Sequence, residues 1–169
     1  MTELSTSAQR VQDALTQLGV VGTVVTLPAS TRTAPEAAAA VGCQVGQIAK
    51  SLVFRATSSD TPILVIASGA NRVNEARLAE LVGEPIGKAD AGKAESGKLK
   101  SENCTGLQCH HCAFSFHISA FRFPLRTFID ADLLAYAEIW AAAGTPNSVF
   151  ALAPADLPRM TGGEVTTLT

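Results

Sequence analysis

The chain has 169 residues, a mass of 17.5 kDa and a formal net charge of -2 at pH 7; 47% of its residues are hydrophobic and 17% are charged. This composition excludes a disordered or fibrous chain, and the length suits one globular domain over residues 1–169. The weak negative charge excludes a general attraction to nucleic acid, no apolar run approaches the roughly 18 residues that span a bilayer, and the N-terminus lacks the pattern of a secretory signal. We therefore expect a cytoplasmic protein with no membrane partner.

Helical spacing and capping signals predict two helices around one short strand in the first quarter of the chain. The first helix is expected between Ser5 and Gly19, because an apolar stripe at helical spacing lies there: Val11, Ala14, Leu15 and Leu18. The β-branched residues 23–27 predict a short strand. Residues 33–36 have the pattern of a capping box with proline in the first turn, so a second, alanine-rich helix is expected to end near Gly42.

Two apolar segments separated by a polar turn predict a β-hairpin. Residues 50–55 and 63–67 are rich in β-branched and large apolar side chains, and the polar residues 57–60 lie between them. A hairpin brings the start of its first strand beside the end of its second strand. We therefore expect Lys50 to lie beside the polar segment 68–72.

Lys50 is unusual because it opens an otherwise apolar strand. With a period of two, Lys50 shares one face of the strand with Leu52 and Phe54, and that face is apolar. This observation leaves two interpretations open. The lysine either extends its ammonium outward into water, or it faces a cleft in which a ligand meets the charge.

Short helices and short strands are mixed in the rest of the chain. Residues 74–81 suit a helix that Gly83 ends, and residues 89–99 suit a weaker helix. Asp130 is expected to cap a helical turn, and the alanine-rich segment 135–143 favours a helix by propensity. The remaining patterns predict strands at 126–129, 149–152 and 164–168 and a helix at 154–160. Such a mixture predicts an α+β fold, in which short helices flank a curved, largely antiparallel mixed sheet.

Several short motifs occur in an order and at spacings that resemble one protein family. They are Thr31-Arg32-Thr33-Ala34, Gly42-Cys43, Gln47-Ile48-Ala49-Lys50-Ser51-Leu52-Val53-Phe54, Ser68-Gly69-Ala70-Asn71-Arg72-Val73, Ala141-Ala142-Ala143-Gly144-Thr145-Pro146 and Thr161-Gly162-Gly163. The combination is far more specific than any one of these motifs. On these motifs the chain resembles the YbaK-type, prolyl-tRNA-synthetase-associated editing domains, which hydrolyse mischarged aminoacyl-tRNA.

The resemblance implies a role for most of these motifs. Lys50 matches the family's catalytic or substrate-positioning lysine, whose cation can stabilise the negative charge that develops in ester hydrolysis or the charge of the substrate's phosphates. The resemblance also implies that water attacks the ester with help from a ribose hydroxyl, without a covalent nucleophile or a cofactor, and that residues 135–143 contain a strand. The implied substrate-binding residues are Arg32, Ser68, Gly69, Asn71, Arg72, Gly144, Thr145 and Pro146.

Several of these residues also fit ordinary structural roles. Gly69 and Gly144 suit turns, and Pro146 can stiffen its loop. Arg32 and Arg72 suit exposed positions in which the charge is solvated. The sequence leaves both interpretations open.

Residues 107–114 depart from the family pattern. The family's glycine-rich loop, whose backbone amides hold the oxyanion, is expected here, but the sequence has neither its glycines nor its proline. Three interpretations remain open for the wider segment 92–123: an altered reading of the coding sequence, genuine divergence with the cysteines and phenylalanines buried as core residues, or a zinc site. The zinc ligands would be Cys104, Cys109, Cys112 and His117, although the family needs no metal.

The leading hypothesis from the sequence is a freestanding, trans-editing aminoacyl-tRNA deacylase for a small amino acid, namely alanine, serine, threonine or cysteine. One alternative is a non-catalytic module that binds tRNA or aminoacyl-tRNA with a degenerate oxyanion loop, and another is a zinc-binding interaction domain. The expected partners are the acceptor end of aminoacyl-tRNA and an aminoacyl-tRNA synthetase, and the expected state is a monomer. A cluster of lysines would make tRNA binding depend on salt: Lys88, Lys93, Lys98 and Lys100.

Overall fold

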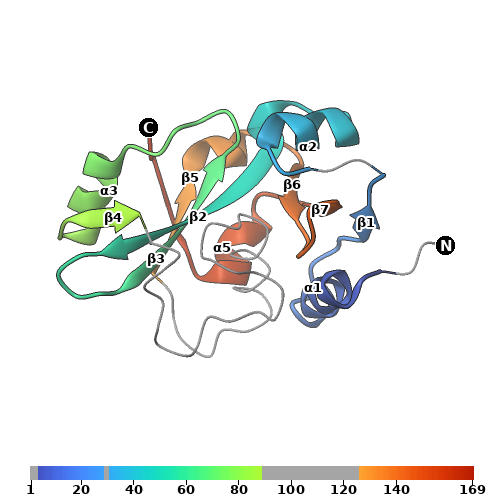
Figure 1. Ribbon diagram of the computed structural model, residues 1–169, viewed down its shortest axis with the longest axis horizontal. Coiled ribbons are helices and arrows are strands. Elements are labelled where there is room, and N and C mark those ends of the chain that lie inside the picture. The colour runs from blue at the N-terminus through green and yellow to red at the C-terminus, as the bar shows by residue number, and fades with distance from the viewer. Residues whose placement is uncertain (1–3, 29–30, 89–125) are drawn as a thin grey trace.

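An open, mixed β-sheet organises the part of the chain that the computed structural model describes, residues 4–28, 31–88 and 126–169 (Figure 1). Its eight strands are β1 (Val24–Thr26), β2 (Ile48–Ala56), β3 (Pro62–Ser68), β4 (Ile86–Lys88), β5 (Arg126–Asp130), β6 (Ile139–Ala142), β7 (Ser148–Leu152) and β8 (Glu164–Thr166). They follow the order β1-β7-β6-β2-β3-β5-β8, and β4 pairs with the end of β2. Four pairings are antiparallel and three are parallel. The predicted α+β fold with a mixed sheet is confirmed.

Short helices flank this sheet, as the helical patterns predicted. They are α1 (Thr6–Gln17), α2 (Ala34–Val41), α3 (Glu75–Val82) and α5 (Asp156–Thr161), together with the 3-10 turns η1 (Val45–Gln47) and η2 (Ala131–Ala135). Within the described ranges, no helix combines the length and the apolar character that crossing a membrane requires.

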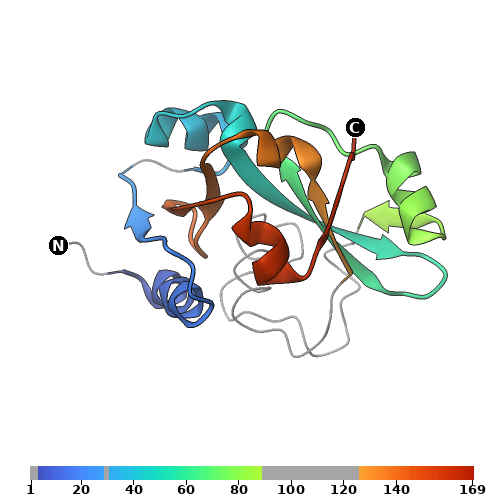
Figure 2. The same cartoon turned by 180° about the vertical axis from the view of Figure 1, so that it is seen from behind.

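Two clusters of buried apolar side chains cover the two faces of the sheet. One cluster joins α1 and α5 to the sheet and includes Leu15, Leu157 and Ile66. Figure 2 shows α5 in front of the strands on this side. The other cluster joins α3 to the opposite face and includes Leu78 and Phe54. Because both faces are packed, β2 and β3 form a rigid support at the centre of the sheet.

Capping groups set the helix starts that the sequence predicted. The Ser5 hydroxyl accepts a hydrogen bond from the Ala8 amide at 3.3 Å at the start of α1. Thr33 and Glu36 form the predicted capping box at the start of α2, each side chain accepting a hydrogen bond from the other's amide. At the start of α3, the Asn74 side chain accepts a hydrogen bond from the Arg77 amide at 3.1 Å, and glycines in the left-handed conformation end both α2 and α3.

The predicted hairpin has the expected register. Lys50 pairs with Ala67, one residue before Ser68, so the two polar segments meet at one end of the hairpin. The residues that share the face of Lys50 are Leu52 and Phe54, and both pack in the cluster under α3. Lys50 therefore lies at the edge of an apolar face, as its position in the strand predicted.

Some element boundaries differ from the predictions. β2 begins at Ile48 because its first two residues pair with β6. α5 begins at Asp156 rather than at residue 154, because the Asp156 amide still closes a turn onto the carbonyl of residue 153. The segment 135–143 contains strand β6, as the resemblance implied, because pairing with β2 and β7 outweighs the helix propensity of its alanines. Leu18, expected in the apolar stripe of α1, is exposed.

The strands β4 and β8 also differ from what the sequence predicted. β4 was not predicted, because three residues become a strand only through their pairing with the end of β2. β8 ends two residues before the predicted limit, and Leu168 beyond it is buried. The predicted helix at 89–99 lies outside the described residues.

Candidate active site

A cavity of about 330 Å³ opens beside the start of β2, between α2 and the sheet. Its volume lies within the range of small-molecule sites, roughly 300–1,000 Å³. The charged side chains in its lining are those of Arg32 and Lys50. The apolar lining includes Ala34, Pro35, Ala37, Val41, Ile48, Trp140, Ala141, Ala142 and Val149. The cavity thus combines an apolar wall with two cations.

The ammonium of Lys50 is held by backbone carbonyl groups. The side chain is half-buried, and Nζ donates hydrogen bonds to the carbonyl oxygens of Gly69, at 3.4 Å, and of Asn71. Both carbonyls belong to the loop after β3, which the hairpin brings beside Lys50. Within the described ranges, no carboxylate forms a salt bridge with Lys50. The carbonyl groups therefore fix the ammonium in place, and no residue of the described ranges is a direct counter-ion to it.

The surroundings of Lys50 lower its pKa below the ordinary lysine value. The largest cause is burial, because the ammonium loses contact with water. The negative charge of Asp130 acts in the opposite direction and raises the pKa, whereas the positive charge of Arg72 lowers it. A partly buried cation with a lowered pKa, lining a cavity, is the kind of group that occurs at functional sites.

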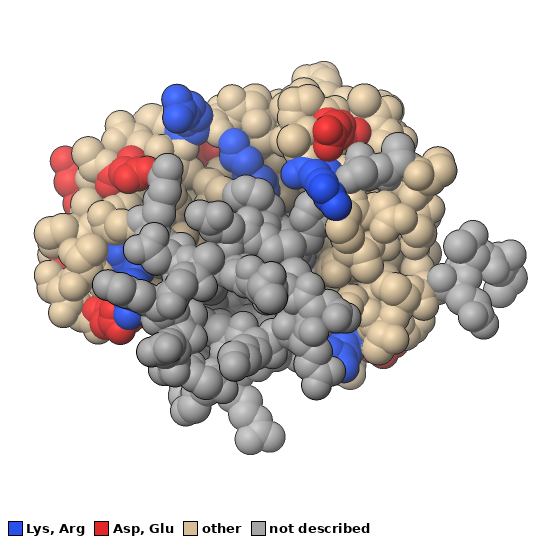
Figure 3. Space-filling view, viewed as in Figure 1, with Lys and Arg blue, Asp and Glu red and all other residues tan. Residues whose placement is uncertain are grey.

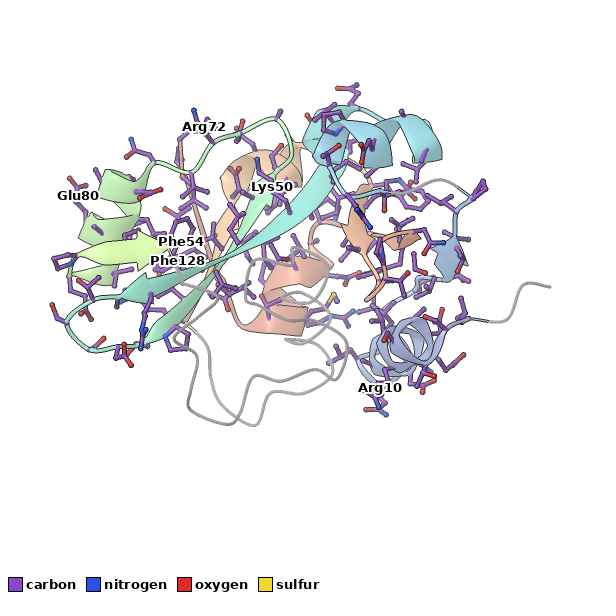
Figure 4. The ribbon with its side chains drawn as sticks, viewed as in Figure 1. Arg10, Lys50, Phe54, Arg72, Glu80 and Phe128 are labelled. Atoms are coloured by element: carbon purple, nitrogen blue, oxygen red, sulfur yellow. The ribbon has the colours of Figure 1, made fainter. Side chains whose placement is uncertain are left out.

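Two other basic side chains, those of Arg32 and Arg72, lie near Lys50. Arg32 lines the same cavity, and Arg72, on the loop after β3, is exposed. Figure 4 shows Lys50 on β2 and Arg72 on that loop, both in the upper half of the view. Figure 3 shows separate Lys and Arg side chains along the upper part of this face, with Asp and Glu side chains among them and further Lys and Arg side chains lower down. Positive charge in this arrangement favours a ligand that carries phosphate groups.

Hydrogen bonds to Gly46, Asp130 and Asp132 fix the loop after β3. The Ser68 hydroxyl donates to the Gly46 carbonyl at 2.8 Å, so this side chain is satisfied within the fold. The Ser68 amide donates to Asp130 Oδ2 at 3.0 Å. Asn71 Nδ2 donates to Asp130 Oδ2 at 2.9 Å and to Asp132 Oδ2 at 2.7 Å. The side chains of Ser68 and Asn71 therefore hold the loop, and the loop's carbonyls hold Lys50.

Gly69 lines the cavity at a point where a side chain does not fit. A Cβ atom at Gly69 would lie 2.3 Å from the Val45 carbonyl oxygen and 2.9 Å from the Ala34 Cβ atom. The glycine is needed because the loop passes this close to η1 and to α2.

Residues 144–146, which follow β6, hold residues that line the cavity without lining it themselves. The Pro146 carbonyl accepts hydrogen bonds from the amide of Thr31, at 2.6 Å, and from its hydroxyl, at 2.9 Å, and Thr31 itself lines the cavity. Gly144 has a φ of 79° and packs against Ser7 of α1. The Thr145 hydroxyl donates to the hydroxyl of the first residue of β7 at 2.6 Å. Gly144, Thr145 and Pro146 therefore support the cavity lining but are not part of it.

The structure thus brings Arg32, Lys50 and Gly69 together at the cavity, out of the residues that the sequence singled out. The other predicted residues lie around this group, either in the supporting loops or, like Arg72, at the exposed edge. The zinc ligand candidates Cys104, Cys109, Cys112 and His117, and the divergent segment 107–114, lie outside the described residues. Within the described ranges, no group of three or more side chains is arranged to hold a metal ion.

Comparison with known proteins identifies the family. A family model of the aminoacyl-tRNA editing domain matches residues 28–160. The chain belongs to this family. The match includes the whole lining of the cavity.

Solved structures agree with this editing domain over its full length. The structure of a proposed trans-editing enzyme for prolyl-tRNA synthetase is 40% identical, with a TM-score of 0.76 and coverage of 99% of each chain. A structure from the computational design of epitope scaffolds is also 40% identical, with a TM-score of 0.79 over 98% of this chain and 99% of that chain. A hypothetical protein with 21% identity shares the fold, with a TM-score of 0.71 over 94% of this chain and 98% of that chain. No curated protein matches the sequence.

Sequence reasoning missed two contributors to the site of the editing domain. Trp140 was assigned only to a strand, yet it lines the cavity. Asp130 was assigned only a capping role, yet it also anchors the loop that holds Lys50. A signal for Asp130 was present, because a carboxylate directly after the apolar run of β5 needs polar partners. Which partners it finds depends on the parallel pairing of β3 with β5.

Proposed function

We propose that this editing domain hydrolyses, in trans, the ester bond of aminoacyl-tRNA mischarged with a small amino acid. The observation that carries the proposal is the position of Lys50, which is half-buried at a cavity and bonded only to carbonyl oxygens among the described residues. Membership of the aminoacyl-tRNA editing family supports the reaction class. Lys50 is the catalytic residue in this proposal, and Arg32 is its neighbour for substrate binding.

The chemistry requires a cation that is already in place. Water adds to the ester carbonyl carbon, and negative charge develops on the carbonyl oxygen. The bond from this carbon to the ribose oxygen then breaks, and the proton from water passes to that oxygen. The Lys50 ammonium, donating to the developing oxyanion or to a phosphate of the acceptor end, lowers the barrier because its orientation is fixed before the substrate binds.

The shape of the cavity supports a small aminoacyl group. At about 330 Å³ it lies near the lower end of the range for ligand pockets, and alanine side chains form much of its wall. Alanine, serine, threonine and cysteine are the proposed substrates. A pocket of this kind discriminates weakly between side chains that differ by one methyl or hydroxyl group.

The similar trans-editing structure supports the proposed partner. That protein is described as a proposed editing enzyme for prolyl-tRNA synthetase, so the proline tRNA is the first acceptor to test here. We propose that the chain acts on the acceptor end as a monomeric, cytoplasmic domain, and that Arg72 and Arg32 contribute to the attraction for the tRNA phosphates.

Deacylation assays test this proposal. Proline tRNA charged separately with alanine, serine, threonine and cysteine is incubated with the wild type and with Lys50→Ala, and release of the amino acid is measured. We expect release of at least one amino acid by the wild type and a loss of about 10²–10³-fold in the variant. Binding that protects all four esters would instead support a non-catalytic binding module.

A further inference from the structure

Asp130 is a buried carboxylate with three hydrogen-bond donors around it. It ends β5, and its residue has a relative exposure of 1%. Oδ2 accepts hydrogen bonds from the Ser68 amide at 3.0 Å and from Asn71 Nδ2 at 2.9 Å, and Oδ1 accepts one from the Asp132 amide at 3.2 Å. A buried carboxylate is stable only when such donors compensate for the loss of water.

The same loop that Asp130 anchors also holds Lys50. Asp130 contacts the two ends of residues 68–71, through the backbone at Ser68 and through the side chain at Asn71. The carbonyl groups of Gly69 and Asn71 accept hydrogen bonds from the Lys50 ammonium. Asp130 is thus connected to Lys50 through the loop, and these hydrogen bonds involve no direct contact between the two charges.

We propose that Asp130 is a positioning residue for Lys50, which fixes the loop carbonyls that aim the ammonium into the cavity. The inference rests on the proposed role of Lys50 in deacylation. It assigns to Asp130 a function beyond its capping of η2. Asp130 acts on the reaction through the loop, and the substrate does not need to touch it.

The charges around Lys50 make this role specific to a carboxylate. Asp130 and Asp132 lie on the side of β5 and η2, Arg72 lies on the loop after β3, and Arg32 lies before α2. Asp130 favours the charged form of Lys50, whereas Arg72 and burial disfavour it. Replacing Asp130 by asparagine therefore removes a negative charge. It also replaces one carboxylate oxygen, an acceptor, by an NH₂ group, a donor, although the loop groups at this position, the Ser68 amide and Asn71 Nδ2, are themselves donors.

The test separates positioning from simple stabilisation of the fold. Asp130→Asn is compared with Arg72→Gln, and with Asp156→Asn as a control that removes a carboxylate paired with Arg159 on α5. The ¹³Cε signal of Lys50 is followed by NMR against pH, and it is assigned by its absence in Lys50→Ala. We expect the titration midpoint of Lys50 to fall in Asp130→Asn, to rise in Arg72→Gln and to stay unchanged in the control.

Deacylation supplies the second readout. We expect kcat to fall about 100-fold in Asp130→Asn, because a displaced catalytic group loses its alignment, while Asp156→Asn retains the wild-type kcat. A folded Asp130→Asn protein with the wild-type Lys50 titration and the wild-type kcat would overturn the inference. Absence of deacylation in the wild type would overturn the proposed function. The Lys50 titration in Asn71→Ala, which keeps the charge of Asp130 but removes the side-chain link to the loop, would still decide whether Asp130 positions Lys50 through the loop.

A second variant covers the case in which Asp130→Asn does not fold. Asn71→Ala removes the side-chain link to Asp130 but leaves the Ser68 and Asp132 amides bonded to the carboxylate. We expect this variant to fold, with a shifted Lys50 titration and a reduced kcat. An unchanged Lys50 titration and an unchanged kcat in a folded Asn71→Ala protein would overturn the inference.

Discussion

The basic side chains at the two ends of the β2–β3 hairpin have different partners. At the turn end, Arg55 forms a salt bridge with Asp60, and Glu84 accepts hydrogen bonds from the turn backbone. At the other end, Lys50 donates to two carbonyl groups and, within the described ranges, forms a salt bridge with no carboxylate. Among the described residues, Arg55 thus has a counter-ion in direct contact, and Lys50 has none.

This difference suits the two ends of one hairpin to different roles. A salt bridge neutralises its cation and leaves little attraction for a ligand. A cation that contacts only carbonyl dipoles keeps its net charge, and partial burial of the ammonium strengthens the interaction of that charge with a substrate. The cavity end therefore suits catalysis, and the turn end suits stability.

The largest expected effect is the loss of kcat/KM when Lys50 is replaced by alanine, compared with the same replacement at Arg55. Lys50→Ala should reduce kcat/KM by about 10²–10³-fold and change the free energy of unfolding by less than about 0.5 kcal/mol. Arg55→Ala should leave kcat/KM unchanged and reduce stability by about 0.2–1 kcal/mol, because its ion pair is near the surface. Deacylation kinetics and urea unfolding of both variants provide the measurements.

The contrast would be wrong if the two variants behaved alike. A loss of several kcal/mol in Lys50→Ala would mean that this lysine is a structural residue. Loss of activity in Arg55→Ala without loss of stability would mean that the turn end also contacts substrate.

Replacing a glycine by alanine at each end of the hairpin tests the same contrast, because the added methyl group fits at one end and not at the other. Gly69→Ala should destabilise the fold by about 1–3 kcal/mol and abolish deacylation, because the new Cβ would lie 2.3 Å from the Val45 carbonyl oxygen and would displace the loop that holds Lys50. Gly87→Ala, at the turn end, places its Cβ 3.6 Å from a methyl group of Thr57, which is an ordinary contact. This control should keep its activity and gain up to about 1 kcal/mol.

Thermal unfolding and deacylation measure both glycine variants. Equal stability of Gly69→Ala and the wild type would show that the loop can move without cost, and the loop would then not be a rigid support for Lys50.

The sequence was sufficient for elements whose signals are local. The capping box of Thr33 and Glu36, the helix that Gly83 ends and the hairpin that carries Lys50 all depend on residues close together in the chain, and the structure confirms them. The α+β fold could be predicted because short strands and helices alternate along the chain. The position of Lys50 beside Ser68 followed from hairpin geometry alone.

The rest depends on contacts between distant segments. Trp140 reaches the cavity only because β6 pairs with β2, and the alanines around it favour a helix. Ser68 is turned toward Gly46 because the loop packs on η1, which no local pattern indicates. Asp130 anchors the loop because β5 pairs with β3, and a single sequence without its sheet order does not contain this information.

The smallest expected effect concerns Glu84 at the turn end. Hydrogen bonds from the Ser59 hydroxyl and amide, and from the Ser58 amide, lower the pKa of the Glu84 carboxyl below its ordinary value. A carboxyl whose pKa is lower in the folded state stabilises the fold at pH values above its pKa in the unfolded chain, and this contribution disappears as the pH falls through its folded pKa. Glu84→Gln should therefore lower Tm slightly at neutral pH and have no effect in acid.

Tm measured from pH 7 down to about pH 2 for both proteins tests this expectation, since ordinary glutamate titrates near pH 4.3. The difference in Tm should shrink below that pH, while kcat at pH 7 should be equal in the two proteins, because Glu84 is at the end of the hairpin that lacks the cavity. A Tm difference that persisted in acid would mean that Glu84 acts through packing or through neutral hydrogen bonds. A changed kcat would mean that the two ends of the hairpin are coupled, and the contrast between Arg55 and Lys50 would then describe one connected site.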